Sequence, residues 1–147
     1  MLMLTVSVEN TIKLIEVENG GSYQAIRDGV GGCFDCVHIP SLGVDMWLHD
    51  EGKILEMPMN AFGTALWVSQ YGMSVFIAGN IVITGGVDKM GETLGLTIEQ
   101  AMQVIELAQQ TIDTIVNTEV VKTITPDQED NLMTESTIET VYQKETN

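Results

Sequence analysis

Residues 22–37 read SYQAIRDGVGGCFDCV and combine a helix start, a glycine-rich break and the beginning of a strand in one short stretch. Ser22 suits the N-cap of a short helix, because its side-chain oxygen can accept a hydrogen bond from an otherwise unpaired backbone N–H. Ile26 and Val30 then lie one helical turn apart, so both are expected to face inward. The rest of the chain is expected to support this unit.

Glycines in this stretch predict where the short helix stops. Gly29, Gly31 and Gly32 are expected to end it, because glycine adopts positive φ and permits close backbone approach. Residues 33–39 that follow are mostly apolar and predict a strand, with Asp35 and His38 as polar interruptions.

Alternation of apolar and polar side chains predicts further strands on both sides of this unit. Residues 4–9 and 12–17 alternate in this way, and so do residues 44–49. Residues 50–52, Asp-Glu-Gly, resemble a tight hairpin turn, after which residues 53–57 are expected to return antiparallel to 44–49.

The middle of the chain predicts a second short helix and a central strand. Asn60 is a suitable N-cap for a helix over residues 61–70, although Gly63 weakens this helix by about 1 kcal/mol relative to alanine. Residues 76–84 form the run richest in β-branched side chains, with a bulge or turn expected at Gly79. We expect this run to be the central strand of a sheet.

A long helix is predicted over residues 98–117. Thr97 and Gln100 match a capping box at its start. Its apolar side chains recur at helical spacing as a single stripe: Ile98, Ala101, Met102, Ile105, Ala108, Ile112 and Ile115. Such a wide stripe needs a partner in the same chain or another, and it predicts a homo-oligomer.

The order of these elements predicts an α+β fold, with a small antiparallel sheet carrying short helices on one face and one long C-terminal helix. Residues 1–117 are expected to form a single domain. From residue 118 the composition shifts to Thr, Glu, Asp and Gln, so residues 118–147 are expected to be a flexible acidic tail.

Charge and hydropathy exclude several classes of function. The 147 residues include 21 acidic and 6 basic side chains, a formal net charge of −15, which opposes direct binding to nucleic acid and to anionic membranes. No apolar run is long enough to cross a bilayer, and residues 1–4 are too short for a signal sequence. The sequence therefore predicts a cytoplasmic protein.

Cys33 and Cys36 have the Cys-x-x-Cys spacing found in redox and zinc sites. A redox pair is expected where a helix begins, whereas this pair enters a strand. A structural zinc ion would need two further ligands, and His38 and His49 are the two histidines of the chain. Two ordinary strand thiols are the favoured interpretation, with zinc and redox chemistry as alternatives, and no cofactor is predicted.

Four short motifs, taken in order, resemble a known family. They are Val30-Gly31-Gly32 before a strand, residues 49–53 (His-Asp-Glu-Gly-Lys), Pro58 with Asn60 before a helix, and residues 78–83 (Ala-Gly-Asn-Ile-Val-Ile). This pattern, over about residues 15–91, resembles the family known as domain of unknown function 3846, whose members are common in phages and mobile elements. The resemblance implies infected or plasmid-bearing bacteria as the setting and supplies no catalytic residue.

No catalytic motif is apparent, because neither histidine has a nucleophilic serine motif beside it and the glycine pairs lack the phosphate-loop pattern. This absence, together with the resemblance to a phage family, leads to the hypothesis of a non-enzymatic binder. Such a protein would sequester a small anionic nucleotide, serving as a bacterial immune signal, in a pocket shared between subunits. Glycine N–H groups and an arginine would hold phosphate while a tryptophan stacks on the base. The candidate ligand-binding residues are Arg27, Gly31, Gly32, Trp47, Asn60 and Trp67.

The alternative is an acidic interaction protein, or DNA mimic, that inhibits a host DNA-binding or defence protein. Glu99, Glu106 and Asp113 would lie in a row on the long helix. Seven helical residues rise by about 10.5 Å, whereas phosphates along one DNA strand recur about every 3.4 Å. The row alone is too sparse for mimicry, so a dimer or the tail would have to add charge.

Overall fold

The computed structural model describes the backbone of residues 1–123 and the side chains of residues 1–117. Five strands and three helices follow one another in these residues. Their bounds are β1 Leu2–Val6, β2 Ile12–Glu16, α1 Ser22–Val30, β3 Phe34–Ile39, β4 Val44–His49, α2 Ala61–Tyr71, β5 Ile81–Gly85 and α3 Ile98–Thr123. The predicted α+β class is confirmed, whereas most of the predicted flexible tail lies outside the described residues.

The strands form a single antiparallel sheet with the order β2-β1-β5-β4-β3. β5 is the central strand, as predicted, and its residue Ile83 pairs with Leu4 of β1 and with Met46 of β4. It begins at Ile81 rather than at residue 76. Gly79, with a φ of 88°, turns the backbone just before it.

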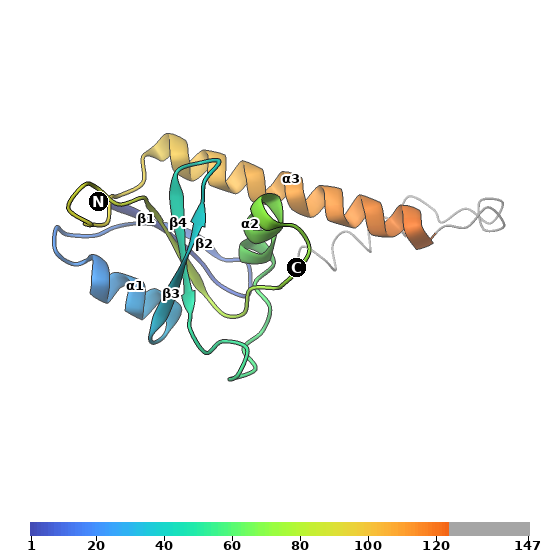
Figure 1. Cartoon of the computed structure of the whole chain (residues 1–147), viewed down its shortest axis with the longest axis horizontal. Helices are drawn as coiled ribbons and strands as arrows, with labels where there is room; N and C mark the ends of the chain where they lie inside the picture. The colour runs from blue at the N-terminus through green and yellow to red at the C-terminus, as the bar shows by residue number, and fades with distance from the viewer. Residues whose placement is uncertain (124–147) are drawn as a thin grey trace.

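Helices cover both faces of the sheet, so the prediction that they share one face is wrong. In Figure 1, α3 runs along one side of the strands and α1 lies on the other. α1 packs on Met3 and Val82, while α2 and α3 pack on the face that carries Leu4, Met46 and Ile83. The central strand is apolar on both faces, and each face must therefore be shielded from water.

Residues 53–57 do not return as a strand beside β4. They belong to a series of turns in which the Leu55 N–H donates to the Glu51 carbonyl and the Met57 N–H donates to the Gly52 carbonyl. β4 already pairs with β3 on one side and with β5 on the other. No free edge of β4 is left for residues 53–57, which is why the predicted hairpin fails.

The ends of α1 also differ from the prediction. Gly21 rather than Ser22 is the N-cap, and no side chain caps this helix. Gly29 lies inside the helix, where a Cβ would overlap a methyl group of Val82. Gly31 is the residue that ends the helix, because its φ of 87° is left-handed. Gly29 therefore serves close packing, not termination.

The capping box of α3 is confirmed. The Thr97 N–H donates to Gln100 Oε1, and the Gln100 N–H donates to Thr97 Oγ1, each over 3.0 Å. The helix continues to Thr123, beyond the predicted end at residue 117.

The predicted apolar stripe of α3 is divided between the interior and the surface. Ala101 and Ala108 are buried in the core shared with α2, as is Val104. Ile98 and Met102 are exposed. The partner that the stripe needed is therefore largely α2 of the same chain. Within the described residues, no helix has the length and hydrophobicity needed to span a membrane.

Candidate binding surface

The predicted phosphate-binding glycines lie at the C-terminal end of α1. The N–H groups of Gly31 and Gly32 both donate to the carbonyl of Arg27, over 2.9 and 3.1 Å. These donors are consequently used in closing the helix, and a helix C-terminus carries partial negative charge that repels an anion. The geometry does not favour a phosphate cradle at this position.

Arg27 and Trp47 lie on the same side of the sheet as these glycines, and both side chains make contacts within the chain. Arg27 Nη1 lies 3.5 Å from Cys33 Sγ, and this contact raises the pKa of the guanidinium. Trp47 packs edge-on against Phe34, and its Nε1 donates to Thr84 Oγ1 over 2.9 Å. The indole is held in the α1 core and is not presented for stacking on a base.

Asn60 is fully buried and has a structural role. Its Oδ1 accepts from the Gly63 N–H at the start of α2, as the N-cap prediction required, and its Nδ2 donates to the carbonyls of Val6 and Gly79. Every polar atom of the amide is therefore engaged within the chain. Asn60 has no free group for a ligand.

Trp67 lies on α2, across the sheet from Arg27 and Trp47. Its Nε1 donates to Ser74 Oγ over 3.2 Å, and its ring lies 4.6 Å from that of Tyr71. The predicted residues are thus distributed over two faces of the sheet. Trp67 lines one of the two hollows described next, on the part of the surface that the structure describes.

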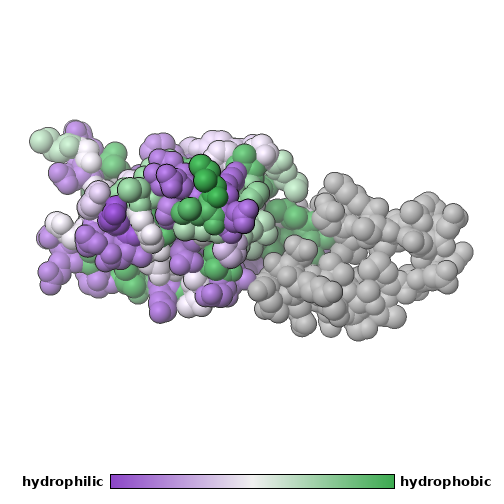
Figure 2. Space-filling view, turned by 90° about the horizontal axis from the view of Figure 1, so that it is seen from below, coloured by the Kyte–Doolittle hydropathy of each residue, from purple (hydrophilic) through white to green (hydrophobic). Residues whose placement is uncertain are grey.

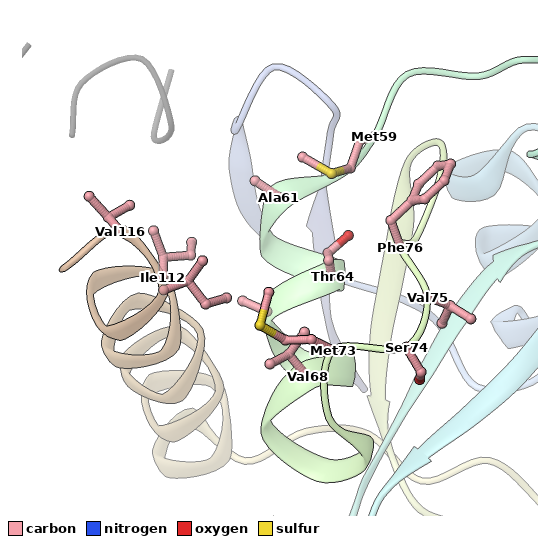
Figure 3. Close-up of a pocket in the computed structure, with 12 residues that line it drawn as sticks. Met59, Ala61, Thr64, Val68, Met73, Ser74, Val75, Phe76, Ile112 and Val116 are labelled. Carbon is pink, nitrogen blue, oxygen red and sulfur yellow. The ribbon is translucent and has the colours of Figure 1, made fainter. Parts of the chain in front are cut away.

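A first hollow of about 370 Å³ lies between α2 and the C-terminal half of α3. Figure 3 shows Ile112 and Val116 of α3 on one side of it, with Met73 reaching toward Val68 of α2. Phe76 lines its opposite edge. Nearly all of the lining is apolar, and the hollow opens to solvent.

A second hollow of about 300 Å³ adjoins the first, because Val75 and Phe76 line both. It is bounded by the turn after β4, by Trp67 and by the sheet. Lys53 Nζ lies 4.8 Å from the centre of the Phe76 ring, a cation–π contact. We refer to the linings of the two hollows together as the Phe76 surface.

The Phe76 surface combines exposed apolar side chains with an acidic edge. Met73 and Ile54 are 72% and 80% exposed. The acidic side chains of Asp35, Asp50 and Glu51 line the second hollow, against the single ammonium group of Lys53. Figure 2 shows hydrophobic groups enclosed by hydrophilic ones on one face of the molecule. This arrangement favours a ligand that is apolar and positively charged over a phosphate.

The Cys-x-x-Cys pair does not act as one unit. Cys33 precedes β3 and contacts Arg27, whereas Cys36 lies within β3, near His38 and Asp45. His38 Nδ1 and Asp45 Oδ1 are 2.6 Å apart. Burial and the Asp45 carboxylate raise the pKa of the Cys36 thiol to about 12, which keeps it protonated and disfavours nucleophilic catalysis.

Sequence reasoning missed most of the Phe76 surface. Residues 73–77 directly follow Gly72 and are apolar except for Ser74, and the strand predicted over residues 76–84 includes the last two of them. The run lies outside regular structure, and Met73, Val75 and Phe76 are exposed. Gly72, followed by four apolar side chains in five residues, is the signal available in the sequence.

Comparison with known proteins identifies a single domain family. The family model described as Domain of unknown function (DUF3846) matches residues 1–112. This match is wider than the predicted range of 15–91 and includes the first half of α3. No curated protein and no solved structure matches the chain. Because the family model covers most of the sequence, the chain belongs to the DUF3846 family.

Proposed function

We propose that this chain is a non-enzymatic binding protein whose Phe76 surface takes up a basic, amphipathic segment of a protein partner. The observation that carries the proposal is the pair of adjoining hollows, apolar inside and acidic at the edge. A bound segment would be withheld from other contacts, so the protein would inhibit its partner.

The shape and chemistry of the surface support an amphipathic partner. A hollow between two helices suits the apolar face of a third helix, which anchors through side chains spaced by helical turns. Met59 and Met73 line the first hollow, and methionine side chains adapt to differently shaped apolar groups. The net charge of −15 attracts a basic segment and raises its rate of association.

A small anionic nucleotide is the second candidate ligand. Lys53, Trp67 and Phe76 line the same hollow, and together they offer one cation and two aromatic rings. The nearby acids Asp50 and Glu51 oppose a phosphate there, which is why the basic segment is preferred. Arg27 lies outside this hollow, so Lys53→Ala, not Arg27→Ala, is the substitution that tests nucleotide binding.

The setting we propose is that of an accessory protein of a phage or other mobile element, acting in the bacterial cytoplasm on a host DNA-binding or defence protein. This setting depends on the family resemblance. We also propose that the protein is a homo-oligomer, because Ile98, Met102 and Ile105 form an exposed apolar row on α3.

The proposed function is tested with labelled synthetic peptides and fluorescence anisotropy at physiological salt. An amphipathic peptide with Leu on one face and Lys on the other is expected to bind, with an affinity in the micromolar range. A Leu/Glu peptide and a Lys/Ser peptide of equal length are expected not to bind, because each lacks one of the two required properties.

Two matched variants locate the binding site. Met73→Glu should weaken the binding of the Leu/Lys peptide by about tenfold or more, because the substitution places a charge in the apolar hollow. Met90→Glu makes the same change at a side chain that is 85% exposed and lies outside both hollows, so it should have no effect. The proposal would be contradicted if the Lys/Ser peptide bound as tightly as the Leu/Lys peptide. It would also be contradicted if Met73→Glu and Met90→Glu changed the affinity equally.

A further inference from the structure

We propose that Cys36, His38 and Asp45 form a binding site for one zinc ion at the β3 edge of the sheet, on the face that carries α1. Each residue offers one ligand atom, and these three atoms all lie within 4.8 Å of one another. This inference is independent of the Phe76 surface, which lies on the opposite face of β3 and β4.

The antiparallel register of β3 and β4 brings the three side chains together. His38 lies directly opposite Asp45 across the strand pair. Cys36 is two residues from His38 in the same strand, so both side chains point to the same face of the sheet. A shift of register by one residue would remove Asp45 from the group.

Sulfur, nitrogen and oxygen are the donor atoms that zinc accepts in proteins. Around a tetrahedral zinc ion with bonds of about 2.0–2.3 Å, the ligand atoms are roughly 3.3–3.8 Å apart. The separations here range from 2.6 Å, between His38 and Asp45, up to 4.8 Å. The His38 side chain is 72% exposed, so its ring can move by the ångström or so that this adjustment needs.

Charge balance also favours a cation at this position. The Asp45 side chain is only 5% exposed, and its carboxylate faces the half-buried Cys36 thiol. A divalent ion would compensate the carboxylate and allow the thiol to bind as a thiolate after releasing its proton. Three protein ligands leave a fourth position for water on the exposed side of His38, as in zinc sites that are not purely structural.

A simpler interpretation is that His38 is merely the hydrogen-bonding partner of a buried carboxylate. That interpretation assigns no role to Cys36, whose sulfur lies within 4.8 Å of both other ligand atoms. A measurement that reports on the sulfur therefore distinguishes the two interpretations.

Cobalt(II) titration of the untagged full-length protein provides that measurement, after treatment with a chelator and desalting. One equivalent of Co²⁺ should produce a thiolate-to-cobalt charge-transfer band in the near ultraviolet and intense visible bands of tetrahedral cobalt. Zn²⁺ should abolish both signals by displacement, because zinc prefers tetrahedral sites of this kind.

Variants identify the ligands. Cys36→Ser should remove the charge-transfer band, and His38→Ala should weaken cobalt binding by at least about tenfold. Cys33→Ser is the matched control, because it removes the other cysteine and should leave the spectrum unchanged. Circular dichroism spectra that match the parent show that the variants are folded. The absence of cobalt bands, or their survival in Cys36→Ser, would overturn the proposal.

Discussion

Asn60 joins three segments of the chain through one buried amide. It caps α2 at Gly63, and it also binds the carbonyls of Val6, at the end of β1, and Gly79, just before β5. Its removal would take away one hydrogen bond from each of these two carbonyls and one from the Gly63 N–H. At the residue scale, Asn60 therefore holds parts of the fold together instead of offering its amide to a ligand.

Asn60→Ala is therefore expected to lower the free energy of unfolding by roughly 2–4 kcal/mol, the sum of a lost helix cap and two lost hydrogen bonds to backbone carbonyls. Urea denaturation followed by circular dichroism measures this change. Asn80→Ala is the control, because Asn80 is exposed and its Oδ1 accepts a hydrogen bond from the Val8 N–H. Asn80→Ala should lower the free energy of unfolding by less than about 1 kcal/mol. Similar losses in both variants would contradict the structural role of Asn60.

The two cysteines are expected to differ in their reaction with a thiol reagent in metal-free protein. Cys33 is exposed and should react readily at pH 8, whereas the pKa of about 12 leaves only about one Cys36 thiol in ten thousand as thiolate. Raising the pH should accelerate the slow phase by about tenfold per unit, because the raised pKa lies above the range tested. Cys36→Ser should abolish this slow phase. A single fast phase for both thiols would contradict the structure.

At the element scale, α1 can approach the sheet closely because Gly29 has no side chain. A Cβ at this position would overlap the Val82 methyl group. Gly29→Ala should thus destabilise the protein by about 1–3 kcal/mol, although alanine is the better helix former by about 1 kcal/mol. The measurement is again urea denaturation.

The same substitution in a Val82→Ala protein tests whether the contact with Val82 causes the destabilisation. In a Val82→Ala protein the obstructing methyl group is gone, so adding Gly29→Ala should be neutral or stabilising by up to about 1 kcal/mol. Equal destabilisation in both backgrounds would mean that Gly29 is needed for its backbone conformation and not for the space it leaves.

The pattern of apolar and polar residues predicts where helices and strands lie better than it predicts which strands pair. The β-rich composition of residues 76–84 predicts a central strand, and β5 confirms its central position with later bounds. The predicted return strand over residues 53–57 is wrong, because a turn signal at residues 50–52 does not tell whether the neighbouring strand has a free edge. Strand pairing is a property of the whole sheet, and one segment does not contain that information.

The same limit applies to the sites. Alternation alone places Cys36 and His38 on one face of a strand, but the addition of Asp45 needs the register of two strands. The Phe76 surface draws on the turn after β4, on α2, on residues 73–78 and on α3. Of the residues proposed from sequence, Trp67 alone lines it, because contacts between remote segments are set by tertiary packing.

At the scale of the whole molecule, the folded domain and its Phe76 surface should not need the residues after Thr123. Val116 is the last described residue in the core and in the lining of the first hollow. A chain ending at Thr123 should keep its urea midpoint and bind the Leu/Lys peptide with an affinity within about twofold of the full chain. A folded truncated chain that no longer binds would place part of the surface beyond Thr123.

Self-association is expected to depend on the exposed row of α3. Light scattering after size exclusion should give the mass of an oligomer for the full chain. Met102→Glu should lower the measured mass toward that of the monomer, because the Met102 side chain is at the centre of the row formed with Ile98 and Ile105. Met90→Glu, outside α3, should leave the mass unchanged. A monomeric full chain would refute the proposed oligomer.

The position of β5 has a consequence for how the chain reaches this structure. The pairs β1–β2 and β3–β4 are each local, whereas β5 comes later in the sequence and lies between them. During synthesis, two hairpins would emerge with the inner edges of β1 and β4 unpaired until residue 85 has left the ribosome. Insertion of β5 is the long-range event that joins them, so it is expected to set the folding rate and to end the period in which nascent chains can aggregate edge to edge.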